Sequence, residues 1–167
     1  MSLMMSGLDC HRAGVALRET LAFSGEQAGA LLNWLSRQPG VEGCVLLSTC
    51  NRTELYISGD PQCSPWQLLC RGAKAPEQEL EPFFTTRVGE DAALHLMEVA
   101  CGIHSQILGE DQIITQVRLS MERSQDCRTL DPTLAALFRH AVTAGKRART
   151  EVHLARGIPS MGTRCRE

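Results

Sequence analysis

Two strand-like runs separated by a short polar turn constrain this 167-residue chain more than any other feature of its sequence. Residues 41–47 form a nearly continuous apolar run, a pattern that favours a central strand. Residues 53–58 alternate, with Leu55 and Ile57 on one face, as a half-buried strand does. The turn between these two strands carries a thiol, hydroxyl groups and a guanidinium, on Ser48, Thr49, Cys50, Asn51 and Arg52.

The patterns on either side extend this pair into an alternating order of strands and helices. Residues 3–8 are typical of a first strand, and Ser24 with Gln27 forms a capping box that opens a helix. Ser64 caps a second helix, and residues 83–88 form a last short strand. The order strand, helix, strand, strand, helix, strand is that of a ferredoxin-like split βαβ unit.

From residue 90 onward the pattern changes to helix. Residues 91–101 form one predicted helix, and residues 110–124 form a second. Asp131 caps a third helix with Pro132 at its first position. We therefore predict an α+β fold, in which a ferredoxin-like split βαβ sheet is followed by a helical subdomain of about three helices.

The spacing and surroundings of the eight cysteines limit the kinds of metal or redox site and the cellular compartment that we expect. No two of them have C-x-x-C spacing, so zinc-ribbon and thioredoxin-like sites have no support, and we expect no metal. Cys44, Cys70 and Cys101 lie inside apolar runs, where cysteine behaves as a small hydrophobic residue. The sequence shows neither a signal peptide nor a membrane span, and we expect a cytoplasmic protein with no membrane association.

Cys50 differs from the other cysteines because it stands at a strand end among polar residues. A thiolate is a nucleophile, and a neighbouring cation or base raises the fraction of thiolate. Arg52 is permanently charged, but spacing does not decide whether it faces the thiol or a substrate carboxylate. From the T-C-N-R motif alone, a buried structural cysteine with Arg52 on the surface is the simpler interpretation.

A second polar group of residues occurs where the first two helices of the helical part meet. His95 lies on the first of these helices, although a lone histidine is more often a structural residue than a catalytic one. Gln112 and Gln116 are four residues apart and share a face of the second helix. The glycine-bounded loop between the helices adds polar groups, on Ser105, Glu110 and Asp111.

Four stretches occur together in one order: "GLDCHRAGVALRE", "LLSTCNRTELY", "HLMEVACGIHSQILGEDQIITQV" and "AGKRARTEVHLARG". Together they resemble the N-terminal catalytic domain of glutamyl-tRNA reductase, the first committed enzyme of five-carbon tetrapyrrole (porphyrin and heme) biosynthesis. The resemblance implies one catalytic domain over residues 1–157. Its ferredoxin-like part would cover residues 1–88 and its helical part residues 89–150, with a tail or linker at 158–167.

The resemblance implies an NADP-dependent oxidoreductase that works through a thioester. The Cys50 thiolate would attack the ester carbonyl of glutamyl-tRNA, and hydride from NADPH would reduce the resulting thioester to glutamate-1-semialdehyde. His95 is implied as a second catalytic residue, and its role as base, acid or positioning group is left open. The implied substrate-binding residues are Thr49, Asn51, Arg52, Ser105, Glu110, Asp111, Gln112 and Gln116.

The sequence has no G-x-G-x-x-G followed by a helix. We therefore expect NADPH to be bound by a domain absent from this chain, and the chain alone not to complete the reduction. The partners implied are glutamyl-tRNA, a second subunit in a homodimer of the full-length enzyme, and the downstream aminomutase. The chain departs from the family at Asp9-Cys10, where Asn-His is usual, at Gly14 in place of Pro, and at His104 in place of Asp.

Two other functions remain open at this stage. A thiol esterase would act on a small ester. A non-catalytic paralogue would bind tRNA or the reductase, although a net charge of −2 provides no global basic field. Its phosphate contacts would come from the basic C-terminal segment, through Lys146, Arg147, Arg149 and Arg156. The intact polar turn together with His95 favours the reductase domain.

Overall fold

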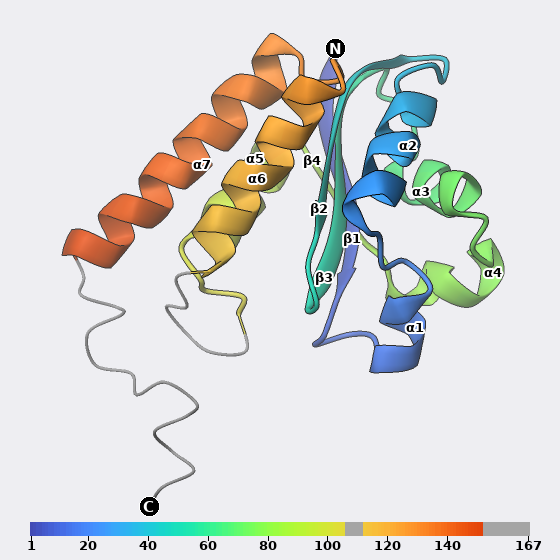
Figure 1. Ribbon diagram of the computed structural model, residues 1–167, viewed down its shortest axis with the longest axis horizontal. Helices are drawn as coiled ribbons and strands as arrows, with labels where there is room; N and C mark the ends of the chain where they lie inside the picture. Colours follow the sequence, from blue (N-terminus) through green and yellow to red (C-terminus); the bar gives the residue numbers. More distant parts are fainter. Residues whose placement is uncertain (106–111, 152–167) are drawn as a thin grey trace, which may run out of the picture.

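A four-stranded antiparallel sheet lies between two layers of helices in the computed structural model, which describes residues 1–105 and 112–151 (Figure 1). The strand order β2-β3-β1-β4 is that of the predicted ferredoxin-like sheet. The predicted tail at residues 158–167 lies outside the described residues. The strands are β1 (Ser2–Asp9), β2 (Val41–Ser48), β3 (Arg52–Gly59) and β4 (Thr85–Val88).

One face of the sheet is covered by α2 (Gly25–Leu35) and α3 (Pro65–Ala73). The predicted capping box of α2 is confirmed, because Ser24 Oγ accepts from the Gln27 amide and Gln27 Oε1 accepts from the Ser24 amide. Three short helices on this side escaped the sequence patterns because each spans five residues or fewer. They are α1 (Val15–Glu19), α4 (Glu77–Leu80) and the 3-10 helix η1 (Glu81–Phe83).

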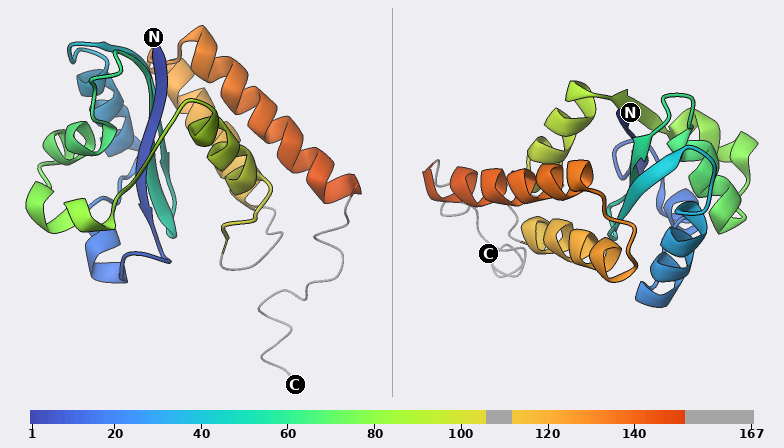
Figure 2. Two further views of the ribbon diagram at one scale, coloured as in Figure 1. Left: turned by 180° about the vertical axis from the view of Figure 1, so that it is seen from behind. Right: turned by 90° about the horizontal axis from the view of Figure 1, so that it is seen from above.

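The other face is covered by α5 (Glu90–Ala100), α6 (Gln112–Asp126) and α7 (Pro132–Glu151), as Figure 2 shows from behind and above. These helices share one core with the sheet, in which Tyr56 packs edge-on against Phe138 with ring centroids 5.3 Å apart. None of the helices in residues 1–105 and 112–151 is long and apolar enough to cross a membrane.

A glycine explains how closely α7 approaches α5. A Cβ atom on Gly145 would come within 2.6 Å of the Ala100 carbonyl oxygen, a distance that side chains do not tolerate. Gly145 therefore lets the two helices touch backbone to backbone, which outweighs the cost of a glycine inside a helix.

The apolar run that predicted a central strand is the edge strand β2, and the prediction was wrong on this point. Helices α2 and α6 cover the two faces of β2, so its side chains are buried as they are in a central strand. The chain between α6 and α7 pairs with its outer edge. The Cys44 amide donates to the Thr129 carbonyl oxygen at 2.8 Å, and Thr129 Oγ1 donates to the Cys44 carbonyl oxygen at 3.0 Å.

Asp131 joins the start of α7 to the sheet. Its Oδ1 accepts from the Leu134 amide at 3.0 Å, which confirms the predicted helix cap. Its Oδ2 accepts from Ser58 Oγ of β3 at 2.6 Å. The same carboxylate therefore caps the N-terminus of α7 and fixes this helix to β3.

We predict that Asp131→Ala lowers the free energy of unfolding by about 2 kcal/mol, because it removes a helix cap and leaves Ser58 without its partner. Urea unfolding followed by circular dichroism measures this. The matched control is Asp126→Ala, an exposed acid at the end of α6, which should change stability by less than about 0.5 kcal/mol. Equal effects of the two substitutions would contradict the assigned role of Asp131.

Candidate active site

The turn between β2 and β3 is shaped by Thr49. Its Oγ1 accepts from the amides of Asn51 and Arg52, both at 3.2 Å. Its own amide donates to the Arg52 carbonyl oxygen at 2.8 Å, and the Asn51 carbonyl oxygen accepts from the Cys10 amide at 2.8 Å. The turn is therefore a fixed structure that is tied to the end of β1.

Cys50 stands at the tip of this turn with its side chain exposed. Within residues 1–105 and 112–151, neither its thiol nor its backbone N–H has a hydrogen-bond partner. The buried cysteines differ, because burial raises the pKa of Cys44 to about 12 and that of Cys70 to about 11, so both stay protonated near neutral pH. Among the seven described cysteines, Cys50 is the exposed one, which leaves its sulfur open to a reactant.

Below the turn, Glu54 is the centre of a buried polar network. Its side chain is 3% exposed, and its Oε1 accepts from Arg52 Nη1 at 3.0 Å and from His95 Nε2 at 2.8 Å. Its Oε2 accepts from the Tyr56 hydroxyl at 2.7 Å. The Glu54 carboxylate thus connects two other residues of β3 with a histidine of α5.

The network keeps Glu54 ionised. Burial by itself raises the pKa of this carboxyl, but the hydrogen bond and the charge of His95, the charge of Arg52 and the hydrogen bond from Tyr56 outweigh burial and bring the pKa below its ordinary value. For Tyr56, burial and then the charge of Glu54 raise the pKa well above its usual range, so the phenol stays protonated and donates.

Gly7 makes room for the Glu54 side chain. Gly7 is the partner of Glu54 in the β1–β3 pair, and a Cβ atom on Gly7 would lie 2.6 Å from Glu54 Cγ. Any side chain at this position would displace the carboxylate from the network. The glycine in "SGLD" is therefore a requirement of the site.

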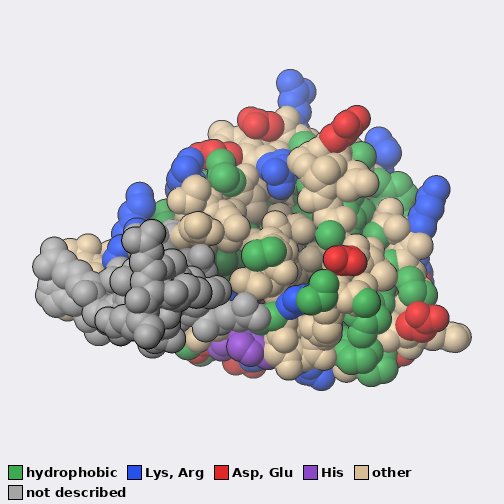
Figure 3. Space-filling model, turned by 60° about the horizontal axis from the view of Figure 1, so that its bottom comes forward, with side chains coloured by type: hydrophobic (Ala, Val, Ile, Leu, Met, Phe, Trp, Pro, Cys, Tyr) green, Lys and Arg blue, Asp and Glu red, His purple; other side chains and the backbone are tan. Residues whose placement is uncertain are grey.

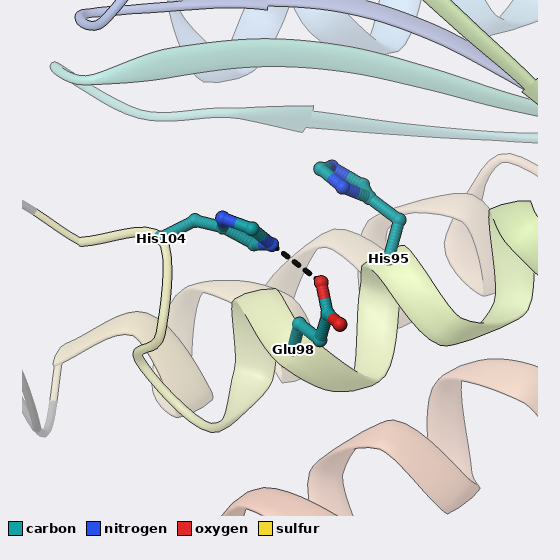
Figure 4. Close-up of side chains that lie close together, drawn as sticks. All are labelled: His95, Glu98 and His104. Carbon is teal, nitrogen blue, oxygen red and sulfur yellow. Dashed lines mark hydrogen bonds and ion pairs between the residues drawn. The ribbon is translucent and has the colours of Figure 1, made fainter.

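A second histidine completes the network from the turn after α5. The His104 ring stacks on the His95 ring with centroids 5.2 Å apart, and its Nε2 bonds Glu98 Oε2 at 2.6 Å (Figure 4). The His104 carbonyl oxygen accepts from Arg52 Nη2 at 2.7 Å and bonds His11 Nε2 at 3.2 Å. Arg52 therefore holds the segment after α5 against the start of β3.

A cavity of about 380 Å³ opens beside this network. Figure 3 brings this end of the molecule forward and shows histidine atoms on its surface, in purple. Glu54, His95 and His104 form part of the cavity wall. Arg12 and Arg87 add two cationic groups, and the buried Arg87 Nε has no hydrogen-bond partner in the described part of the chain. The cavity wall thus combines histidines with two guanidinium groups, one of which has a buried nitrogen without a hydrogen-bond partner among the described residues.

The structure places the residues predicted from the sequence in different parts of this region. Glu54 brings Arg52 and His95 together, whereas Thr49 and Asn51 belong to the turn. Ser105 follows His104 and donates its amide to the Gly102 carbonyl oxygen at 3.3 Å. Gln112 is exposed at the start of α6 and Gln116 is half-buried one turn later, while Glu110 and Asp111 lie outside the described residues.

Sequence analysis missed the residues that organise the network, above all Glu54 and Tyr56. The signal was present, because Arg52, Glu54 and Tyr56 alternate along one strand and must share a face. The alternating pattern, with Leu55 and Ile57 on the apolar face, predicted that the other face of this strand is exposed to solvent. Helices cover that face as well, so a charged pair inside it indicates a buried network.

Comparisons with known proteins agree with one another on this chain. Residues 6–152 match the family model described as "Glutamyl-tRNAGlu reductase, N-terminal domain". Glutamyl-tRNA reductase of Acetivibrio thermocellus is 40% identical over 156 residues, which cover 92% of this chain and 47% of that protein. The protein of the same name from a Synechococcus strain is 37% identical over 169 residues, which cover 98% of this chain and 39% of that protein.

The fold has a counterpart among solved structures. Glutamyl-tRNA reductase from Methanopyrus kandleri superimposes with a TM-score of 0.77 at 31% sequence identity. The match covers 96% of this chain and 37% of that one. The chain therefore spans about half the length, or less, of the relatives that it matches.

We predict that Glu54→Gln lowers the free energy of unfolding by about 3–5 kcal/mol at pH 7, because it leaves buried Arg52 without its counter-ion. Since the pKa of Glu54 is lowered by folding, its contribution is complete above the ordinary value of 4.5 and is lost as the pH falls through the folded value. The difference between the wild type and the variant in urea unfolding should therefore be constant from pH 7 to about 5 and shrink below it.

Tyr56→Phe is the milder comparison, because it removes one hydrogen bond and should cost about 1 kcal/mol. It keeps the carboxylate, so the acid-dependent loss seen in the wild type should persist. If Glu54→Gln retained the full acid dependence of the wild type, Glu54 would not be its source.

Alkylation of the native protein should modify Cys50 before the buried Cys44 and Cys70. Cys44, with a pKa of about 12 against an ordinary 9.0, holds about 1000-fold less thiolate than an ordinary thiol and is buried besides. Iodoacetamide labelling at pH 8 with peptide mapping by mass spectrometry measures the order. In urea the two sites should react at similar rates, and native labelling of Cys44 or Cys70 ahead of Cys50 would contradict the assignment.

Proposed function

Because this chain belongs to the family of glutamyl-tRNA reductase N-terminal domains, we propose that it carries the thioester-forming step of glutamyl-tRNA reduction. The activity proposed for the whole protein is the NADPH-dependent reduction of glutamyl-tRNA to glutamate-1-semialdehyde, in the cytoplasm, as part of tetrapyrrole biosynthesis. The observation that carries the proposal is the exposed Cys50 thiol, fixed at a tight turn within the residues that match the family.

The proposed reaction is an acyl transfer. The Cys50 thiolate attacks the carbonyl carbon of the ester that joins glutamate to tRNA, and a carbon–sulfur bond forms. The ester carbon–oxygen bond then breaks, and the terminal hydroxyl of the tRNA leaves with a proton. The products are a glutamyl thioester on Cys50 and uncharged tRNA.

The turn supplies a group for the oxyanion that forms in this step. The amides of Thr49, Asn51 and Arg52 are used within the turn, whereas the Cys50 N–H has no partner among the described residues. A free backbone N–H beside the attacked carbon is a typical oxyanion donor. We assign the Cys50 N–H to this role.

His95 can act only through one nitrogen. An ionised carboxylate only accepts hydrogen bonds, so His95 Nε2 is protonated and donates a hydrogen bond to Glu54. Nδ1 of the neutral ring is then the nitrogen able to accept a proton. Among the roles left open by the sequence, this favours general base, with Glu54 fixing the tautomer.

The cavity beside the network suits the glutamyl group. Its side-chain carboxylate needs a charge-assisted hydrogen bond, which Arg87 Nε can donate without losing another partner. Arg52, which the resemblance implies as a substrate-binding residue, already binds Glu54 and the His104 carbonyl oxygen. We therefore propose Arg87 for the carboxylate and Arg52 for holding the site together.

The residues described do not fit NADPH. Their sheet is antiparallel, and the sequence has no G-x-G-x-x-G turn to hold a pyrophosphate. We derive no hydride step from this chain and place cofactor binding in another part of the whole protein. A homodimer and the downstream aminomutase are proposed as partners of that whole protein on the family relationship alone.

Incubation with glutamyl-tRNA that carries labelled glutamate should give a labelled protein that hydroxylamine discharges, as it does a thioester. Cys50→Ser should abolish the label. Cys63→Ser, which changes a half-buried cysteine distant from the turn in sequence, should retain it. A hydroxylamine-sensitive label that survives Cys50→Ser would overturn the nucleophile.

The same assay tests the cavity. Arg87→Gln should slow labelling at low glutamyl-tRNA concentration by about 10-fold or more, with recovery at saturation, because a charge-assisted bond to substrate contributes about 1.5–3 kcal/mol. An unchanged concentration dependence would place the substrate carboxylate elsewhere.

A further inference from the structure

We infer that His95, Glu98 and His104 form a binding site for a divalent transition-metal ion of the zinc class. One ligand atom of each side chain lies within 4.8 Å of the others. Figure 4 shows the arrangement, with His95 and Glu98 projecting from α5 and His104 entering from the turn that follows. Neither the sequence motifs nor the acyl-transfer chemistry requires an ion at this place.

The spacing of the ligands follows from the fold. His95 and Glu98 are three residues apart on α5, so they share one face of the helix. His104 is brought back over this face because its carbonyl oxygen is bonded to Arg52 and His11. The three ligand positions are therefore held by the backbone and by hydrogen bonds from β3 and from the loop after β1.

His95 provides the independent evidence for a ligand. Its side chain is 9% exposed, and its Nδ1 is buried with no hydrogen-bond partner in the described residues. When the His95 ring is neutral, its proton lies on Nε2, which donates to Glu54, and Nδ1 carries a lone pair. Buried polar atoms nearly always have a partner, and an imidazole lone pair backed by a carboxylate on the other nitrogen is the usual state of a metal-ligating histidine.

The donor set selects the class of ion. Two imidazole nitrogens and one carboxylate with a fourth position open are a common set for zinc, and they also suit cobalt and nickel. Magnesium prefers oxygen ligands in an octahedral arrangement, so it should not compete. Both histidines line the cavity, from which a water molecule can supply the fourth ligand.

Binding requires a small rearrangement of the site. Ligand atoms around a tetrahedral zinc ion lie about 3.4 Å apart, so the His95 nitrogen and the other two ligand atoms, now within 4.8 Å, must approach by about 1 Å. His104 Nε2 and Glu98 Oε2, now 2.6 Å apart, must separate by a similar amount. Glu98 and His104 are each about one-third exposed and can rotate to do so. The ion replaces their present hydrogen bond, and the proton on His104 Nε2 moves to Nδ1 or to solvent.

The site overlaps the nitrogen that we propose as general base, but ion binding does not depend on that function. An ion on His95 Nδ1 removes the lone pair that would accept a proton. Metal binding and base catalysis at His95 are therefore mutually exclusive, so saturating zinc should slow thioester formation. Binding measured without substrate remains a separate observation.

Titration of chelator-treated protein with Zn²⁺ by calorimetry, and with Co²⁺ by visible absorption, tests the inference. We expect saturable binding of one ion per chain, with a cobalt spectrum typical of four or five nitrogen and oxygen ligands. His104→Ala should weaken binding by about 100-fold and Glu98→Gln by about 10-fold or more. Both side chains are partly exposed, and circular dichroism should show that both variants fold.

Matched controls use residues outside the cluster. His140→Ala on α7 and Glu90→Gln at the start of α5 change exposed side chains and should leave the affinity unchanged. Nitrogen-15 NMR should show the His95 Nδ1 resonance shifting on addition of zinc. The inference is overturned if binding is not saturable, if it survives both His104→Ala and Glu98→Gln, if magnesium competes equally, or if a thiolate-to-cobalt charge-transfer band reveals cysteine ligands.

Discussion

The buried carboxylate of Glu54 makes the interactions on which the candidate site depends. It binds Arg52, Tyr56 and His95 at once, and in this way joins β3 to α5. An unpaired charge at this depth would be strongly destabilising, so the three donors are needed for the carboxylate to stay ionised. In turn, the carboxylate fixes the tautomer of His95 and the direction of Arg52, through which His104 is held.

The fold makes this network possible by burying both faces of the sheet. Helices α2 and α3 cover the face with Leu55 and Ile57, while α5, α6 and α7 cover the face with Glu54 and Tyr56. Gly7 leaves the space that the Glu54 side chain occupies. The turn with the exposed Cys50 thiol is therefore followed directly by β3, whose first residues form the buried ionised network.

Several parts of the structure were predictable from local patterns. The capping box at Ser24, the Asp131 cap and the order of strands and helices follow from short-range hydrogen bonding and periodicity, and the structure confirms them. The position of β2 was not predictable, because an edge strand covered by helices on both faces has the same apolar pattern as a central one. The pairing of Glu54 with His95 joins residues 41 positions apart, which no local pattern records.

By itself, the sequence determined the class of fold, the family and the place of Cys50 at a turn between two strands. It could do so because strand and helix periods and the motifs around Cys50 and His95 are local properties of the chain. Only the tertiary structure decided that Arg52 is buried, that Glu54 organises the site, and that His95, Glu98 and His104 converge. These depend on which faces of the sheet are covered and on how the turn after α5 returns to β3, and both are set by long-range packing.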